Sequence, residues 1–241
     1  MRSYARVFAT VGLFALFVGV LGLEAATVEG TFERTLTVTG AVTLDVATGS
    51  GNITVRGGEP GRVHIVGRYR IRDTWFGARA EEKARLLEDN PPIQQDGNRI
   101  RVGHIEDARL RRDVSISYEI VTPSETALDA ASGSGSQEIT GIQGPVEARC
   151  GSGNISLARI GGDVEVSTGS GSLRLDEIGG SVAARTGSGN IHISSAGAGV
   201  NAATGSGRVE VGRAGAEVEA TTGSGSIWLA GVSRDVRARS G

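Results

Sequence analysis

The second half of the chain alternates apolar and variable positions, and this alternation repeats every eighteen residues. One apolar column contains Ile155, Leu173, Ile191, Val209 and Ile227, and the column two residues further on contains Leu157, Leu175, Ile193, Val211 and Leu229. The column between them holds Ser156, Arg174, His192, Glu210 and Trp228, which share no property. An apolar residue at every second position is typical of a strand with one buried face.

A second strand is predicted in each repeat. An all-valine column contains Val146, Val164, Val182, Val200, Val218 and Val236, and two residues later come Ala148, Val166, Ala184, Ala202, Ala220 and Ala238. Small residues in this inner column predict a narrow interior. Each eighteen-residue repeat is therefore expected to form one coil made of two short strands.

The tripeptide Gly-Ser-Gly marks the repeat boundary. It begins at Gly133, Gly151, Gly169, Gly187, Gly205 and Gly223, and Gly241 falls in phase. A second corner carries glycine or alanine, as at Gly161–Gly162 and Gly179–Gly180. We expect corner glycines to supply a positive φ, which strains other residues.

The residues before the tripeptide are Cys150, Thr168, Thr186, Thr204, Thr222 and Ser240. Since they share parity with the inward columns, their hydroxyls should bond the corner backbone of their own or an adjacent coil.

A fixed period without insertions is the signature of a solenoid, in which each repeat buries its apolar face against its neighbours. The sequence therefore predicts an all-β, single-stranded, right-handed parallel β-solenoid with six eighteen-residue coils over residues 131–241. Like strands should stack about 4.8 Å apart.

Two other glycine-rich motifs fit this chain poorly. Calcium-binding repeats need acidic ligands after the glycines. The column there is Ser136, Asn154, Ser172, Asn190, Arg208 and Ser226, which contains no carboxylate. A phosphate-binding loop needs a lysine and a following helix, and neither comes after "TGSGNI". We expect no metal and no cofactor.

Residues 27–130 are expected to form a β-rich cap on the first coil. An isolated copy of the coil pattern, "TLDVATGSGNITVRGG", covers residues 43–58. Strands are predicted at 63–71 and 113–123, and a strand–turn–strand around Asp96–Gly97. The segment "GARAEEKARLLEDN" predicts a short helix anchored by Leu86 and Leu87 and ended by Pro91–Pro92.

The N-terminal residues 1–26 resemble an export signal. Arg2 and Arg6 precede an uncharged apolar run from Val7 to Leu23, and Ala25–Ala26 offer a cleavage site. The alternative is an uncleaved N-terminal anchor, which would be the chain's one contact with a membrane. In either case we expect an exported protein that is periplasmic, cell-surface or extracellular.

Composition narrows the function further. The formal net charge of −2 argues against nucleic-acid binding, which requires a basic excess. With one cysteine, Cys150, the chain can form no intramolecular disulfide, and we expect Cys150 to be a buried small side chain in the threonine column.

Three segments carry a resemblance to a known family. "NPPIQQDGNRIRVG", "LRRDVSISYEIVTP" and the "TGSGNI" repeats together resemble a bacterial adhesin β-strand-repeat family, the head GIN domain-like proteins of uncharacterised function. The resemblance covers residues 31–241 and implies a parallel β-solenoid on an exported or envelope-associated protein. It implies no catalytic residues. This chain departs from the family by stopping at Gly241, where relatives continue.

Candidate chemistry is sparse. His64, His104 and His192 have no metal-site or triad spacing, and His192, which lies in a variable outward column with no partner motif, is expected to be a solvated surface residue. The outward column Glu147, Glu165, Ala183, Asn201, Glu219, Arg237 stacks two carboxylates, with Arg149, Arg159 and Arg185 near enough to neutralise them. Paired carboxylates are what glycosidases use, but a solvated charged face is the simpler interpretation.

Two hypotheses follow. The first is a non-catalytic surface or periplasmic binding and scaffold module, an adhesin-like protein whose partner is a glycan or another envelope component. The alternative is a glycan-active β-helix enzyme using Glu147 and Glu165. Because residues 223–241 form an ordinary coil, we also expect the chain either to continue in its natural form or to self-associate end to end.

Overall fold

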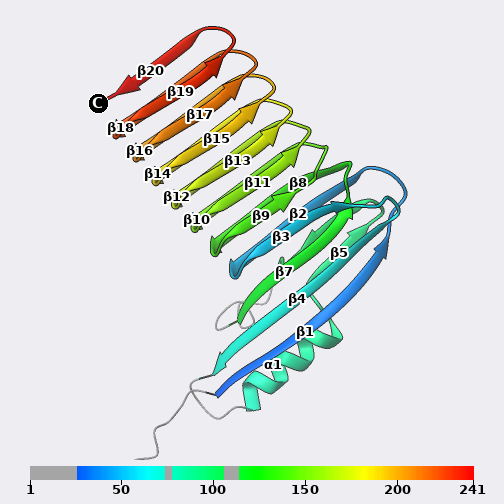
Figure 1. The fold of residues 1–241 in the computed structure, drawn as a ribbon. Coiled ribbons are helices and arrows are strands. Elements are labelled where there is room, and N and C mark those ends of the chain that lie inside the picture. Colours follow the sequence, from blue (N-terminus) through cyan, green and yellow to red (C-terminus); the bar gives the residue numbers. More distant parts are fainter. Residues whose placement is uncertain (1–25, 74–77, 106–113) are drawn as a thin grey trace, which may run out of the picture.

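The computed structural model describes residues 26–73, 78–105 and 114–241, and the predicted export segment at 1–25 lies outside them. The molecule is an elongated stack of strands with a helix at one end and the last strand at the other (Figure 1). The predicted all-β solenoid of parallel eighteen-residue coils is confirmed. No helix among the described residues is long and apolar enough to span a membrane.

The described residues of the N-terminal half form seven strands and one helix. In chain order they are β1 Ala26–Thr37, β2 Val42–Ser50, β3 Ile53–Gly58, β4 Arg62–Asp73, α1 Ala78–Asp89, β5 Ile93–Asp96, β6 Arg99–Val102 and β7 Val114–Pro123.

The contiguous coils follow, two strands to each coil. Their strands are β8 Thr126–Ser134, β9 Gln137–Thr140, β10 Val146–Ser152, β11 Ile155–Ile160, β12 Val164–Ser170, β13 Leu173–Ile178, β14 Val182–Ser188, β15 Ile191–Ala196, β16 Val200–Ser206, β17 Val209–Ala214, β18 Val218–Ser224, β19 Ile227–Val232 and β20 Val236–Ser240. The cap boundary that we set at residue 130 falls within β8.

The two strands of each coil belong to two different sheets. Sheet A has the order β1-β4-β7-β3-β9-β11-β13-β15-β17-β19, and sheet B has the order β20-β18-β16-β14-β12-β10-β8-β2-β6-β5. Along the coils, equivalent residues pair with a shift of eighteen, as Val146 does with Val164. The isolated copy at 43–58 forms β2 and β3, which stack directly on β8 and β9. It is therefore the first coil, separated from the second by an insertion.

The insertion builds the cap together with β1, which precedes the first coil. Strand β6 pairs parallel with β2 and β7 pairs parallel with β3, so together they form one more layer at the end of the stack. Strands β4 and β1 then continue sheet A antiparallel, and β5 continues sheet B antiparallel. Helix α1 packs against β1 and β4 (Figure 1).

Helix α1 has one of its two predicted anchors. Leu87 is buried, but Leu86 is 49% exposed, so the prediction for Leu86 is wrong. Consecutive helical residues point about 100° apart, and only one of them can face the sheet.

The Tyr69 hydroxyl donates to Glu88 Oε1 over 2.5 Å, and burial together with this bond to a carboxylate raises the pKa of Tyr69 to about 12.

The predicted inward columns form the core. Valines 146, 164, 182, 200 and 218 are at most 3% exposed, and the alanine–valine column beside them is almost completely buried. Residues on alternate positions face solvent, as the period of two requires. Val236, in β20 at the end of the stack, is 48% exposed.

The threonine column bonds the preceding coil, as expected. Thr168, Thr186, Thr204 and Thr222 are buried, and each Oγ1 donates to the carbonyl of the last glycine in the previous corner over 2.9–3.0 Å. Cys150 takes the same role, because its Sγ contacts the Gly135 carbonyl at 3.3 Å. The hydroxyls therefore tie each corner to the next.

The expectation that the corner glycines supply a positive φ is only partly right. Among the last glycines of the tripeptides, a φ in the left-handed region occurs at Gly51, Gly135 and Gly153 but not in the later coils. A Cβ on any of these glycines from Gly135 onward would instead overlap the carbonyl of the glycine one coil earlier, as Gly189 would with Gly171. Close backbone stacking, more than dihedral freedom, requires glycine here.

Replacing Val182 by aspartate should destabilise the protein on the order of 4 kcal/mol, because the carboxylate would be buried without a partner. Chemical denaturation measures the change. The matched control is Ala203→Asp, whose side chain points outward beside Arg185. Equal stability of the two variants would contradict the inward assignment of the valine column.

Replacing Gly189 by alanine should cost about 2–3 kcal/mol, since the added methyl group meets the backbone of the preceding coil. The matched control is Gly49→Ala in the first coil, where an added Cβ meets no atom within 4 Å. Urea titration of both variants compares them, and a similar loss of stability at the two positions would refute the stacking explanation.

Candidate functional site

A groove of about 800 Å³ runs across the outer face of sheet B. It crosses β6, β2, β8, β10, β12 and β14, so it lies along the solenoid axis and spans the junction between the cap and the coils. Five strand spacings of about 4.8 Å give it a length of about 24 Å. We call it the sheet B groove.

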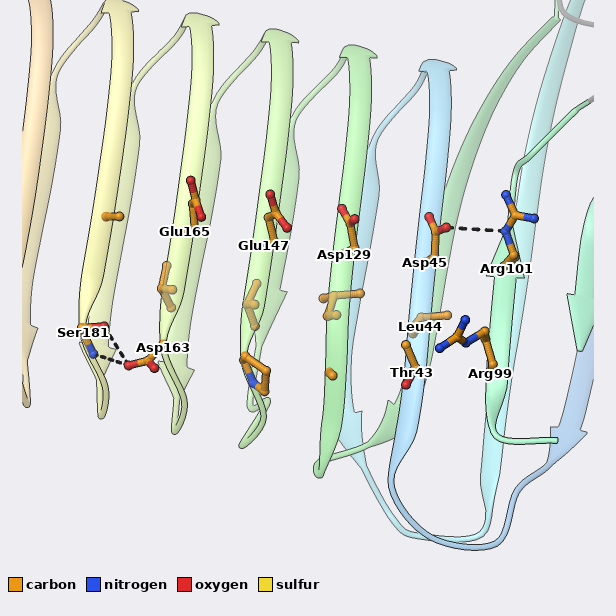
Figure 2. Close-up of a pocket in the computed structure, with 16 residues that line it drawn as sticks. Thr43, Leu44, Asp45, Arg99, Arg101, Asp129, Glu147, Asp163, Glu165 and Ser181 are labelled. Carbon is orange, nitrogen blue, oxygen red and sulfur yellow. Dashed lines mark hydrogen bonds and ion pairs between the residues drawn. The ribbon is translucent and has the colours of Figure 1, made fainter. Parts of the chain in front are cut away.

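Four carboxylates line one side of the groove, one on each of four adjacent strands (Figure 2). Asp45 pairs with Asp129, Asp129 with Glu147, and Glu147 with Glu165 in the strand register. The repeat places them there, because each lies four residues before a corner tripeptide and points outward. We call these four residues the carboxylate row.

Cations neutralise the carboxylate row. Arg149 contacts Asp129 over 3.0 Å and also forms an ion pair with Glu147, so it bridges two coils. Arg185 contacts Glu165 over 3.4 Å. All of these side chains are roughly half exposed, so each ion pair is open to water and to a ligand.

The cap supplies the cations at the other end of the row. Arg101 Nε lies 3.6 Å from Asp45 Oδ2, and His104 Nε2 lies 2.8 Å from Asp45 Oδ1. Both residues come from the β6 region, which sits beside β2 in sheet B. Arg99 also lines the groove and has no ion pair with any described residue, so its guanidinium is free to meet a ligand.

Small side chains make the hollow beside the row. Ala127, Pro145 and Ser181 line it, and they leave room above the strands. At the far end, Ser181 donates both its backbone N–H and its hydroxyl to Asp163 Oδ1 over 2.8 Å. These two bonds lower the pKa of Asp163 below its usual value, so the groove keeps this negative charge in mildly acidic conditions.

The structure brings Glu147 and Glu165 together as predicted, on neighbouring strands. Arg149 and Arg185 contact them, but Arg159 does not neutralise them: it lies on β11 in sheet A with a φ of 55°. A glycosidase needs one carboxyl held protonated and the other ionised, which requires contrasting surroundings. Here both carboxylates are partly exposed and paired with an arginine, so their surroundings are alike.

The three histidines lie apart from one another. His64 contacts Thr35 and Glu33, and His104 contacts Asp45. His192 lies in the outward column, and its Nδ1 is 3.3 Å from Glu210 Oε2, because the strand register sets the two side by side. No cluster suited to a metal ion occurs in the part of the chain that the structure describes.

Cys150 is buried, as expected, and lies in the threonine column. The Ser132 hydroxyl donates to its Sγ over 3.2 Å, and Gln137 Nε2 donates to that hydroxyl over 3.1 Å. These bonds explain Cys150 as a structural side chain of the corner.

Sequence reasoning missed half of the carboxylate row and its cap cations. Asp45 was not singled out because the insertion hides the register between the first and second coils, and Asp129 because the coils were expected to begin at residue 131. A signal was present: both residues precede a Gly-Ser-Gly by four positions, as Glu147 and Glu165 do. Arg99, Arg101 and His104 had no such signal, since they belong to the cap and reach the groove only through strand pairing.

Comparison with known proteins gives a likeness of fold. No protein-family model and no curated protein sequence matches the chain, so the family resemblance in its sequence stays a prediction. A solved Bacteroides fragilis protein described as a "putative adhesin" is similar, with 16% identity, a TM-score of 0.47, and 88% of this chain and 96% of that one covered.

Two further solved structures are similar over most of their length. A "putative lipid binding protein" from Parabacteroides distasonis has 12% identity and a TM-score of 0.42, with 88% of this chain and 95% of that one covered. A "putative cell adhesion protein" from Clostridium sporogenes has 8% identity and a TM-score of 0.33, with coverage of 87% and 100%. At such identities and scores, the likeness says nothing about what this chain binds.

Removing the bridging arginine should expose the repulsion within the carboxylate row. Arg149→Ala is expected to destabilise the protein by about 1 kcal/mol at low salt, because Asp129 and Glu147 lose their shared cation. In about 1 M salt, where the Debye length is about 3 Å, the loss should shrink. Arg56→Ala, on the outer side of β3 in sheet A, is the control and should change little. A salt-independent loss would show that Arg149 acts through packing instead.

Proposed function

We propose that this protein is a non-catalytic, exported binding module that holds an extended polar polymer, a glycan of the cell envelope, in the sheet B groove. The observation that carries the proposal is the carboxylate row with its arginines, repeated in strict register along a groove about 24 Å long.

The chemistry of the groove suits a polyhydroxylated chain. Carboxylates accept hydrogen bonds and guanidinium groups donate them, whereas a sugar hydroxyl can do both. The ion pairs keep the face close to neutral, so it is built to exchange hydrogen bonds more than to attract one sign of charge. Its spacing of about 4.8 Å per strand is close to the rise of one sugar in an extended β-linked glycan.

The groove is also held in place before any ligand arrives. Its side chains project from paired strands, and the arginines fix the carboxylate rotamers. A site ordered in advance loses less conformational entropy on binding. The predicted export segment agrees with an envelope ligand, and the inward and corner columns are explained by packing and by the bonds between coils.

The test is a binding screen of the full chain against a panel of envelope polysaccharides and defined oligosaccharides, with calorimetry on the hits. The double variant Arg149→Ala, Arg185→Ala should weaken binding at least tenfold, and Arg56→Ala should leave it unchanged. Binding should also strengthen as the oligosaccharide lengthens toward the length of the groove.

Two outcomes would overturn the proposal. One is an affinity for the glycan that is the same in the double variant as in the parent protein. The other is turnover of a bound polysaccharide that Glu165→Gln abolishes, which would establish the glycan-active enzyme using Glu147 and Glu165.

A further inference from the structure

We infer a second ligand site on the opposite side of the coils, on the outer face of sheet A, that takes a sugar carrying a negative charge. It consists of Arg174, His192, Arg208, Glu210 and Trp228, and we call it the sheet A site. It shares no residue with the sheet B groove, so either site can fail without the other.

The strand register lines up four of these side chains. Arg174 pairs with His192, His192 with Glu210, and Glu210 with Trp228 across β13, β15, β17 and β19. They occupy the outward column whose members have no chemical property in common in the sequence. Successive members are therefore about 4.8 Å apart along the axis.

Arg208 joins the row from the corner before β17. It has the same parity as Glu210 and so projects from the same face. Its Nε donates to Ser226 Oγ over 3.3 Å, and Ser226 lies two residues before Trp228 on that face. The Arg208 guanidinium is thereby directed toward the strand that carries Trp228.

The five residues of the sheet A site include two arginines and one carboxylate, whereas the charges that line the groove and the arginines paired with them nearly cancel. Arg174 and Arg208 form no ion pair with a described residue, whereas the one carboxylate, Glu210, lies 3.3 Å from His192. A hollow of about 250 Å³ lies between the two arginines and is also lined by Asn190 and Ser172. Two unpaired guanidinium groups beside a hollow fit a carboxylate or a sulfate.

Trp228 identifies the rest of the ligand as a sugar. It is 53% exposed, although tryptophan is among the side chains that gain most from burial. An indole face takes the C–H face of a pyranose ring, and amide, hydroxyl and carboxylate groups nearby take its hydroxyls. The row places the apolar indole of Trp228 and the polar Glu210 on neighbouring strands.

The experiment uses the fluorescence of Trp228 in the full chain. The chain has two tryptophans, so Trp75→Phe leaves Trp228 as the sole reporter. The probes are an oligogalacturonide, the same oligomer with its carboxylates methyl-esterified, and a sulfated oligosaccharide. We expect a saturable fluorescence change with the acidic probes and at least tenfold weaker binding of the neutral ester.

Variants complete the test. Arg208→Ala should weaken binding of the oligogalacturonide at least tenfold, and Trp228→Ala, followed by calorimetry, should abolish it. Trp228→Phe should restore part of it, because the smaller ring still stacks. Arg56→Ala, a matched arginine on the outer side of β3 that belongs to neither site, should bind as the parent does.

Equal affinity for the acid and its ester would overturn the inference, as would absence of a saturable signal with either acidic probe. An equal loss of binding in Arg56→Ala would also overturn it, because it would point to net charge and not to this site. Since the groove variants leave these residues untouched, failure here leaves the proposed function standing.

Discussion

Contact between the backbones of successive corners is the constraint on which the rest of this structure depends. At the last glycine of each tripeptide, the chain passes so close to the previous coil that a Cβ has no room. The threonine hydroxyls then bond the same glycine carbonyls across the coils. A coil with one residue more or fewer would lose both contacts, so the repeat keeps its length of eighteen without exception.

Because the corners fix the register, every column of the sequence becomes a row on the surface or in the core. The inward rows are nearly uniform, since valine, alanine and isoleucine must fill a narrow interior at constant width. The outward rows are free to vary, and here the two faces differ. Sheet B carries carboxylates neutralised by arginines, and sheet A carries unpaired arginines beside a tryptophan.

The contiguous coils could be predicted from the sequence almost residue by residue. The period of two follows from strands with one buried face, and the period of eighteen follows from the stacking of equal coils. The first coil was also recognisable from its pattern. Its position in the stack could not be predicted, because the insertion between Gly58 and Thr126 interrupts the eighteen-residue period. Only the strand pairing shows that β2 adjoins β8. Asp45 was missed for this reason, and Asp129 because the coils were expected to begin two residues after it. Arg159 was misplaced because proximity in sequence does not reveal which sheet a residue joins.

The outward rows also contain a longer period than the coil. Arg149 and Arg185 stand two coils apart in one row, with Ser167 between them. At the corner, Asn52, Asn154 and Asn190 alternate with residues whose backbone N–H groups they accept, at Ser136, Ser172 and Arg208. As far as Arg208, two coils, about 9.6 Å at the usual strand spacing, therefore form the repeating unit of both features. Neither feature continues into the next coil, where Thr221 and Ser226 take these positions. A polymer built from disaccharide units would meet the same arrangement of donors at each repeat, whereas a uniform chain would use only every second position.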